Sequence, residues 1–117
     1  MKPPDGDVPH GRPTMIVRAW SARATPEGAV SYRRHFQNQV MPALKTISGQ
    51  RGALLLSRVD DADTELVVLT FWESMDAVRT FAGTEATTAV VAPEAGRVLK
   101  DFDREVRMFE VVLDARA

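Results

Sequence analysis

Large apolar side chains occupy both faces of the segment Leu66–Trp72, and this pattern predicts a strand that is covered on both sides. Successive side chains of a strand point to opposite faces, so the segment divides into two sets, Val67, Leu69 and Phe71 against Leu66, Val68 and Trp72. A small sheet with helices on one face normally leaves its other face in water and alternates apolar with polar residues. This strand does not alternate, so a second copy of the chain is expected to cover its second face.

Three other segments have the composition of strands. Apolar side chains recur along each of them, and they comprise Met15–Ala22, Arg51–Val59 and Glu105–Leu113. The acidic run at 60–63 has turn chemistry and joins the second of these strands to the Leu66 strand.

This turn predicts the register of a hairpin. If Val59 pairs with Thr64, Arg58 lies opposite Glu65. A cross-strand ion pair of this kind contributes only about 0.2–1 kcal/mol, but it supports the register. Two further pairs follow from it, Leu55 with Val68 and Ala53 with Thr70.

A long helix is predicted after the first strand. Thr25 has the character of an N-cap because a proline and a glutamate follow it, and apolar residues then recur at helical spacing as far as Ile47. Pro42 lies inside this pattern, so the helix should kink or break near Val40-Met41.

Shorter helices are predicted after the Leu66 strand. Ser74 should cap a helix that Gly83 ends, a weaker helical stretch is expected at Thr84–Val91, and Pro93 should begin another helix.

The resulting order, βαββαβ, predicts an α+β fold of the ferredoxin-like kind, with helices packed on one face of an antiparallel sheet. One domain is expected at 14–114. Residues 1–13 hold four of the seven prolines and almost no apolar surface, so they are expected to form a disordered N-terminal extension. The strands with two apolar faces favour a homodimer in which two sheets meet.

The composition of the chain argues against several classes of function. The chain has 15 basic and 16 acidic residues with no concentrated basic face, so no nucleic-acid partner is expected. It has no cysteine, which favours a cytoplasmic location, and no apolar run approaches the roughly 20 residues of a membrane helix. The histidines and carboxylates show no metal-ligand spacing, so neither a metal nor another cofactor is expected.

Six segments resemble the antibiotic biosynthesis monooxygenase family. They cover most of the chain from Thr14 to Leu113 and are Met15–Trp20, Gly49–Ala53, Phe71–Ser74, Ala77–Gly83, Ala92–Ala95 and Val106–Val111. The resemblance implies a dimeric α+β barrel. It also implies a small-molecule function, because members include cofactor-independent monooxygenases of polyketide aromatics, haem-degrading enzymes, isomerases and proteins without known activity.

The chain departs from parts of this family. Haem-degrading members carry an asparagine on the first strand and a haem-ligating histidine after the tryptophan of the third strand, whereas no histidine here follows His35. Ser21 and Met108 stand where similar members carry histidines. The resemblance therefore does not favour haem degradation.

The candidate site residues combine apolar walls with few polar groups. His35 is the one histidine within the predicted domain and is the candidate general base, while the alternative, which the sequence favours, is a half-exposed helix residue. A flat aromatic ligand would be bound by Trp72, Trp20, Tyr32, Phe81, Met108 and, through an anionic oxygen, Arg18.

Two functions are compatible with this set. The first is an enzyme of secondary metabolism, such as a cofactor-independent monooxygenase, isomerase or cyclase, that acts on a flat aromatic polyketide intermediate. The second is a non-catalytic small-molecule-binding or accessory protein of the same fold, which the exchange of both family histidines favours.

Overall fold

The computed structural model describes residues 15–116. The extension predicted at 1–13 lies outside the described residues, and so does Thr14 at the start of the predicted domain.

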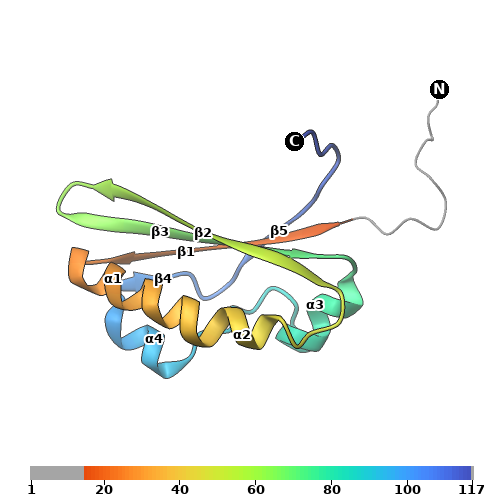
Figure 1. The fold of residues 1–117 in the computed structure, drawn as a ribbon, viewed down its shortest axis with the longest axis horizontal. Coiled ribbons are helices and arrows are strands. Elements are labelled where there is room, and N and C mark those ends of the chain that lie inside the picture. The colour runs from red at the N-terminus through yellow and green to blue at the C-terminus, as the bar shows by residue number, and fades with distance from the viewer. Residues whose placement is uncertain (1–14, 117) are drawn as a thin grey trace.

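An antiparallel sheet of five strands forms one layer, in the order β2-β3-β1-β4, with β5 also paired to β1 (Figure 1). The three long strands are β1 (Ile16–Ala24), β2 (Gln50–Asp60) and β3 (Asp63–Trp72). β4 (Asp101–Phe102) and β5 (Arg107–Glu110) pair with opposite ends of β1 and share the fourth position of the sheet. The fold is therefore α+β and ferredoxin-like, as the element order predicted.

The predicted hairpin register is confirmed. Val59 pairs with Thr64, and Arg58 pairs with Glu65, whose Oε1 lies 2.6 Å from the guanidinium Nε. The two further predicted pairs, Leu55 with Val68 and Ala53 with Thr70, are also present. A bulge separates Gln50 from Ala53 at the start of β2.

The helix after β1 continues through the point where a kink or break was expected, and it changes its form there. α1 (Pro26–His35) passes into a π-helical turn, η1 (Phe36–Val40), and then into α2 (Met41–Leu44). Pro42 cannot donate to the carbonyl four residues before it. The chain accommodates this with a wider turn just upstream, in which the Met41 N–H donates to the Phe36 carbonyl, five residues back.

The other two helices begin and end near the predicted residues. The Ser74 hydroxyl accepts from the Ala77 N–H and caps α3 (Met75–Ala82), which ends at Gly83 with a φ of 84°. α4 (Pro93–Val98) begins at its proline. All four α-helices lie on the same side of the sheet (Figure 1).

Two predictions about the C-terminal third are wrong. The segment Thr84–Val91 is not helical, because its backbone bonds to a distant segment: the Ala89 N–H donates to the Arg104 carbonyl, and the Val106 N–H donates to the Thr87 carbonyl. The last strand is not Glu105–Leu113 but the shorter β5. Since β1 begins at Ile16, the chain beyond Glu110 has no strand left beside it.

The two faces of the sheet differ in burial. The even-numbered residues of β1, and those of β3 from Leu66 on, are buried under the helices, and they include Ile16, Trp20 and Trp72. The opposite side, here called the open face, is formed by Val17, Ala19, Leu54, Leu56, Val67, Leu69, Phe71, Arg107 and Phe109. Its apolar side chains remain accessible, with Leu54 46% and Leu56 44% exposed.

Candidate active site

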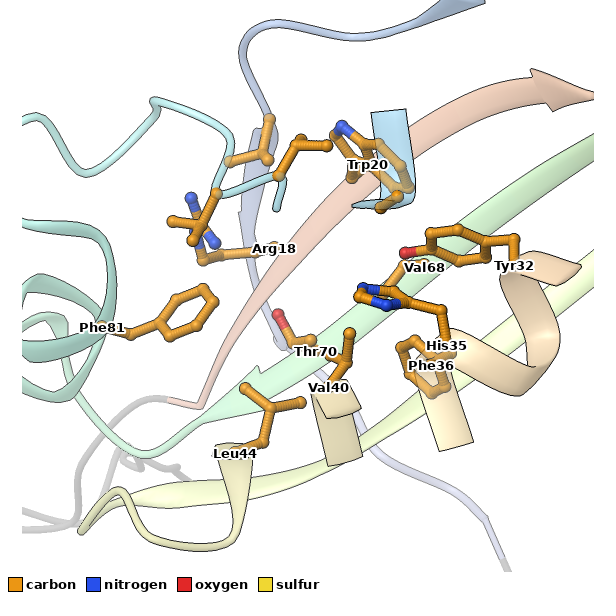
Figure 2. A pocket seen from close by; sticks show the side chains of 14 residues that line it. Arg18, Trp20, Tyr32, His35, Phe36, Val40, Leu44, Val68, Thr70 and Phe81 are labelled. Atoms are coloured by element: carbon orange, nitrogen blue, oxygen red, sulfur yellow. The ribbon is translucent and has the colours of Figure 1, made fainter. Parts of the chain in front are cut away.

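A cavity of about 70 Å³ lies between the sheet and its helices (Figure 2). A single water needs roughly 10–15 Å³ on this measure, so the space admits several waters or a small ring. The lining side chains come from β1, β3, the five helical segments, the loop before α4 and the loop between β4 and β5: Arg18, Trp20, Tyr32, His35, Phe36, Val40, Leu44, Val68, Thr70, Phe81, Val90, Val91, Ala95 and Val106.

Aromatic rings form one end of the cavity. The Tyr32 ring lies 5.8 Å from the Trp20 ring and 6.3 Å from the Phe36 ring, measured between centroids. The Trp20 indole N–H donates to the Asp103 carbonyl at 2.8 Å, which fixes the orientation of this wall. This end therefore offers flat apolar surfaces in a defined arrangement.

Tyr32 adds a polar group to this end. Its side chain is buried, and Figure 2 shows the hydroxyl directed into the cavity. Burial raises the pKa of the Tyr32 phenol to about 12, because the phenolate would lose its hydration. The group is therefore a neutral hydrogen-bond donor at ordinary pH.

His35 stands at the mouth of the cavity. It is half-buried and lines both the cavity and a neighbouring surface groove, which also includes Ser31, Arg34 and Asn38. Its ring centroid lies 5.8 Å from that of Tyr32. No hydrogen bond joins the imidazole to another residue within 15–116, so its nitrogens are available to a ligand. His35 of α1 is thus half-exposed and at the same time reaches the cavity.

Arg18 occupies the other end. Only 5% of its surface is exposed, and its Nη2 donates to the carbonyls of Ala86 at 3.1 Å and Thr88 at 2.8 Å. The guanidinium carbon lies 5.5 Å from the centroid of the Phe81 ring. Its Nε is buried without a hydrogen-bond partner. Burial lowers the pKa of the guanidinium from its ordinary value, although an arginine remains charged at neutral pH.

Two residues expected at the cavity wall lie behind it. Trp72 is fully buried, and its indole N–H donates to the Thr70 hydroxyl at 2.8 Å, while its ring lies 5.3 Å from that of Phe81. Met108 is half-buried and packs between the two clusters of core residues. Phe81 lines the cavity as predicted, and Thr70 lines it without having been predicted.

Ser21, at a position where similar family members carry histidine, does not line the cavity. Its backbone N–H donates to the Asp103 carboxylate, and its carbonyl accepts from the Asp103 N–H. The side chain belongs to the side of β1 away from the helices. The residue at this position therefore does not contribute to the lining of the cavity.

Within the described part of the chain, no group of three or more histidine, aspartate or glutamate residues could hold a metal ion. Among the same residues, no helix has the length and apolar character needed to cross a membrane.

Comparison with known proteins identifies the fold. Neither the protein-family models nor the curated proteins give a match. Solved structures do match, among them a protein of the antibiotic biosynthesis monooxygenase type from Bacillus cereus. It is 16% identical with a TM-score of 0.64, and the match covers 89% of this chain and 99% of that one.

Two further matching structures contain bound ligands. The haem-degrading protein of Mycobacterium tuberculosis, with two haems bound in its active site, is 27% identical with a TM-score of 0.57 over 86% of this chain and 99% of its own. The ActVA-Orf6 monooxygenase of Streptomyces coelicolor, in complex with nanaomycin D, is 12% identical with a TM-score of 0.52 over 91% and 92%.

The class that these structures define is that of small α+β proteins of the antibiotic biosynthesis monooxygenase type, and this chain has their fold. The resemblance seen in the sequence segments is thereby confirmed at the level of the fold.

Proposed function

We propose that the protein is a cofactor-independent monooxygenase that oxidises a small, flat aromatic of the phenol or anthrone kind in the cavity between sheet and helices. The observation that carries the proposal is the composition of that cavity: aromatic walls, one imidazole at the mouth and few other polar groups. The neighbours support a small-molecule enzyme of this general type.

In this proposal His35 begins the reaction. A nitrogen of its imidazole takes a proton from the aromatic substrate, as a histidine that acts as a general base does. The resulting carbanion gives electrons to dioxygen, a C–O bond forms, and loss of water leaves a quinone. For anthrone, one dioxygen is consumed and anthraquinone and one water are produced. The apolar walls exclude bulk water from the intermediate.

We do not extend haem degradation to this chain. His35 is the only histidine in the described residues, and it lies at the cavity mouth on α1.

Oxygen uptake with anthrone tests the proposal. The wild-type protein should accelerate both oxygen consumption and anthraquinone formation above the spontaneous rate, and His35→Gln should lower the enzymatic rate by about 10²–10⁴-fold. Arg34→Gln is the matched control, since Arg34 is the neighbouring helix residue but does not line the cavity. Full activity in His35→Gln would show that His35 is not the general base.

A second candidate is binding without catalysis. The observation that favours it is that no other residue within 15–116 forms a hydrogen bond with His35, so nothing described here orients the imidazole as a catalytic base is usually oriented. In that case the protein would bind aromatic ligands, and neither anthrone nor a related phenol would be turned over.

We also propose that two copies associate through the open face. Leu54, Leu56 and Phe109 are each more than 40% exposed on it, although large apolar side chains normally need cover. A paired sheet of this kind is the barrel arrangement that the family resemblance implies. The cytoplasmic location favoured by the cysteine-free sequence stays a prediction.

A further inference from the structure

We propose that the ligand of this cavity is an anion, a flat aromatic that carries a carboxylate or phenolate oxygen, and that Arg18 binds this oxygen. The inference rests on the proposed small-molecule function and adds to it the charge of the ligand and the position at which that charge is held.

The first ground is a buried cation without an anion. Charged groups are rarely buried unless they are paired, because the loss of hydration is costly. Arg18 is 5% exposed, yet within 15–116 no carboxylate lies within ion-pair distance of its guanidinium. Two backbone carbonyls and the face of Phe81 compensate part of that cost. A full negative charge is still lacking at this end of the cavity.

The second ground is geometry. The two carbonyls that accept from Nη2 belong to Ala86 and Thr88, so the guanidinium is anchored on the side of that loop. Among the described residues, Nη1 makes no hydrogen bond and Nε is a buried donor without a partner. Figure 2 shows the side chain entering the cavity wall between Phe81 and Trp20. Arg18 is thus a preorganised cation that still has hydrogen-bond donors without a partner among the described residues.

The third ground is the shape of the surroundings. The Phe81 ring lies against the guanidinium, and the rings of Tyr32 and Trp20 form the far wall. An inorganic anion would leave these aromatic surfaces without contact. A planar ring with one anionic oxygen uses both the walls and the cation, since arginine binds carboxylates through charge-assisted hydrogen bonds.

Two probes that differ mainly in charge test the inference. Benzoate and benzamide have nearly the same shape, and their dissociation constants can be measured by tryptophan fluorescence and by calorimetry at neutral pH. We expect wild-type protein to bind benzoate at least about tenfold more tightly than benzamide. In Arg18→Gln this preference should fall below about threefold.

Arg23→Gln is the charge-matched control. Arg23 lies on the same strand, but its guanidinium pairs with Asp60 at 2.6 Å and does not line the cavity. The preference for benzoate should survive in this variant. If it falls as far as in Arg18→Gln, general electrostatics explain it and the assignment to Arg18 is wrong.

A second measurement applies if Arg18→Gln does not fold. In wild-type protein labelled with ¹⁵N-arginine, benzoate should shift the side-chain signal that is missing from the Arg18→Lys spectrum, and benzamide should leave it in place. Equal binding of the two probes, no shift of this signal, or no binding of benzoate at millimolar concentration would each overturn the inference.

These results are separable from the proposed catalysis. If benzoate binds through Arg18 but anthrone is not oxidised, the monooxygenase proposal fails and the anion site stands. If anthrone is oxidised but benzoate has no advantage over benzamide, the anion site fails alone.

Discussion

Tyr32 is the only tyrosine of the chain, so its ionisation reports on the cavity without interference from another phenol. We expect the ultraviolet absorbance of phenolate to appear near pH 12 in the folded protein, because burial raises the pKa of Tyr32 from 10.0 to about 12. The same titration in concentrated denaturant is the control and should give a value near 10. Equal midpoints in the two conditions would show that the hydroxyl is in contact with bulk water.

The same shift has a consequence for stability. Below pH 10 both the folded and the unfolded chain keep the phenolic proton, whereas between pH 10 and 12 only the folded chain does. The free energy of unfolding should therefore fall across this interval, by up to about 1.4 kcal/mol per pH unit from this group.

Thr70 holds the indole of a tryptophan that has no access to water. Thr70→Val keeps the shape of the side chain but removes the acceptor of the Trp72 N–H, so the free energy of unfolding should fall by about 1–3 kcal/mol in urea denaturation. Thr70→Ser keeps the hydroxyl and should recover most of this loss. Equal stability of the two variants would mean that the buried hydrogen bond contributes little.

Much of the cavity could be predicted at the residue scale. Strand alternation and helix spacing brought Trp20, Tyr32 and Phe81 to the helix side of the sheet, and each of them lines the cavity. Trp72 and Met108 share that side but lie behind the wall, because side-chain packing decides depth and alternation decides only the face. Val90 and Val91 were missed because their segment was predicted to be helical.

At the scale of the elements, one glycine sets the distance between α1 and α4. A Cβ at Gly28 would lie 2.3 Å from the Val98 carbonyl oxygen, which is backbone and cannot turn away. Gly28→Ala should therefore push the two helices apart and lower the free energy of unfolding by about 1–3 kcal/mol, measured by chemical denaturation.

Gly96 within α4 provides the control. A Cβ there would approach no atom more closely than 3.7 Å, the Cε2 of Phe102. Gly96→Ala should stabilise the protein by about 0.4–1 kcal/mol, because it restricts the unfolded chain without a clash. If the two substitutions had the same effect, close packing of α1 against α4 would not be the cause.

An element could be predicted from the sequence where residues close together in the chain determine its structure. The register of the β2–β3 hairpin was predicted correctly, because a short turn and one charge pair specify it. The prediction of a helix at Thr84–Val91 was wrong because hydrogen bonds to residues 104–106 fix the backbone of this segment. The predicted end of the last strand was wrong because the strand ends where its partner β1 begins. Pro42 marked the irregularity in the helix but not its π-helical form.

At the scale of the whole molecule, the open face predicts the state of association. The protein should be a dimer by light scattering, with an interface above roughly 2,000 Å² in total, as obligate dimers have. Leu54→Lys with Leu56→Lys should give a folded monomer, since both side chains are already exposed in one protomer and removing them costs the protomer little.

Val59→Lys is the control for this prediction. Val59 lies on the same strand at the hairpin end, 79% exposed, and strand alternation places it on the opposite face from Leu54. The dimer should persist in this variant. A monomeric wild-type protein, or a dimer that withstands both lysines of the double variant, would exclude association through the open face.

The divided fourth position of the sheet also limits how copies of the protein aggregate. A long unpaired strand edge is a template for fibril growth. β4 has two residues and β5 has four, so this edge exposes only short runs of free backbone groups. The other edge, β2, is distorted by the bulge after Gln50, where Gly52 adopts a φ of 111°. Growth into a continuous intermolecular sheet is thus disfavoured at the β4–β5 edge, and at β2 it is interrupted at the end that carries the bulge.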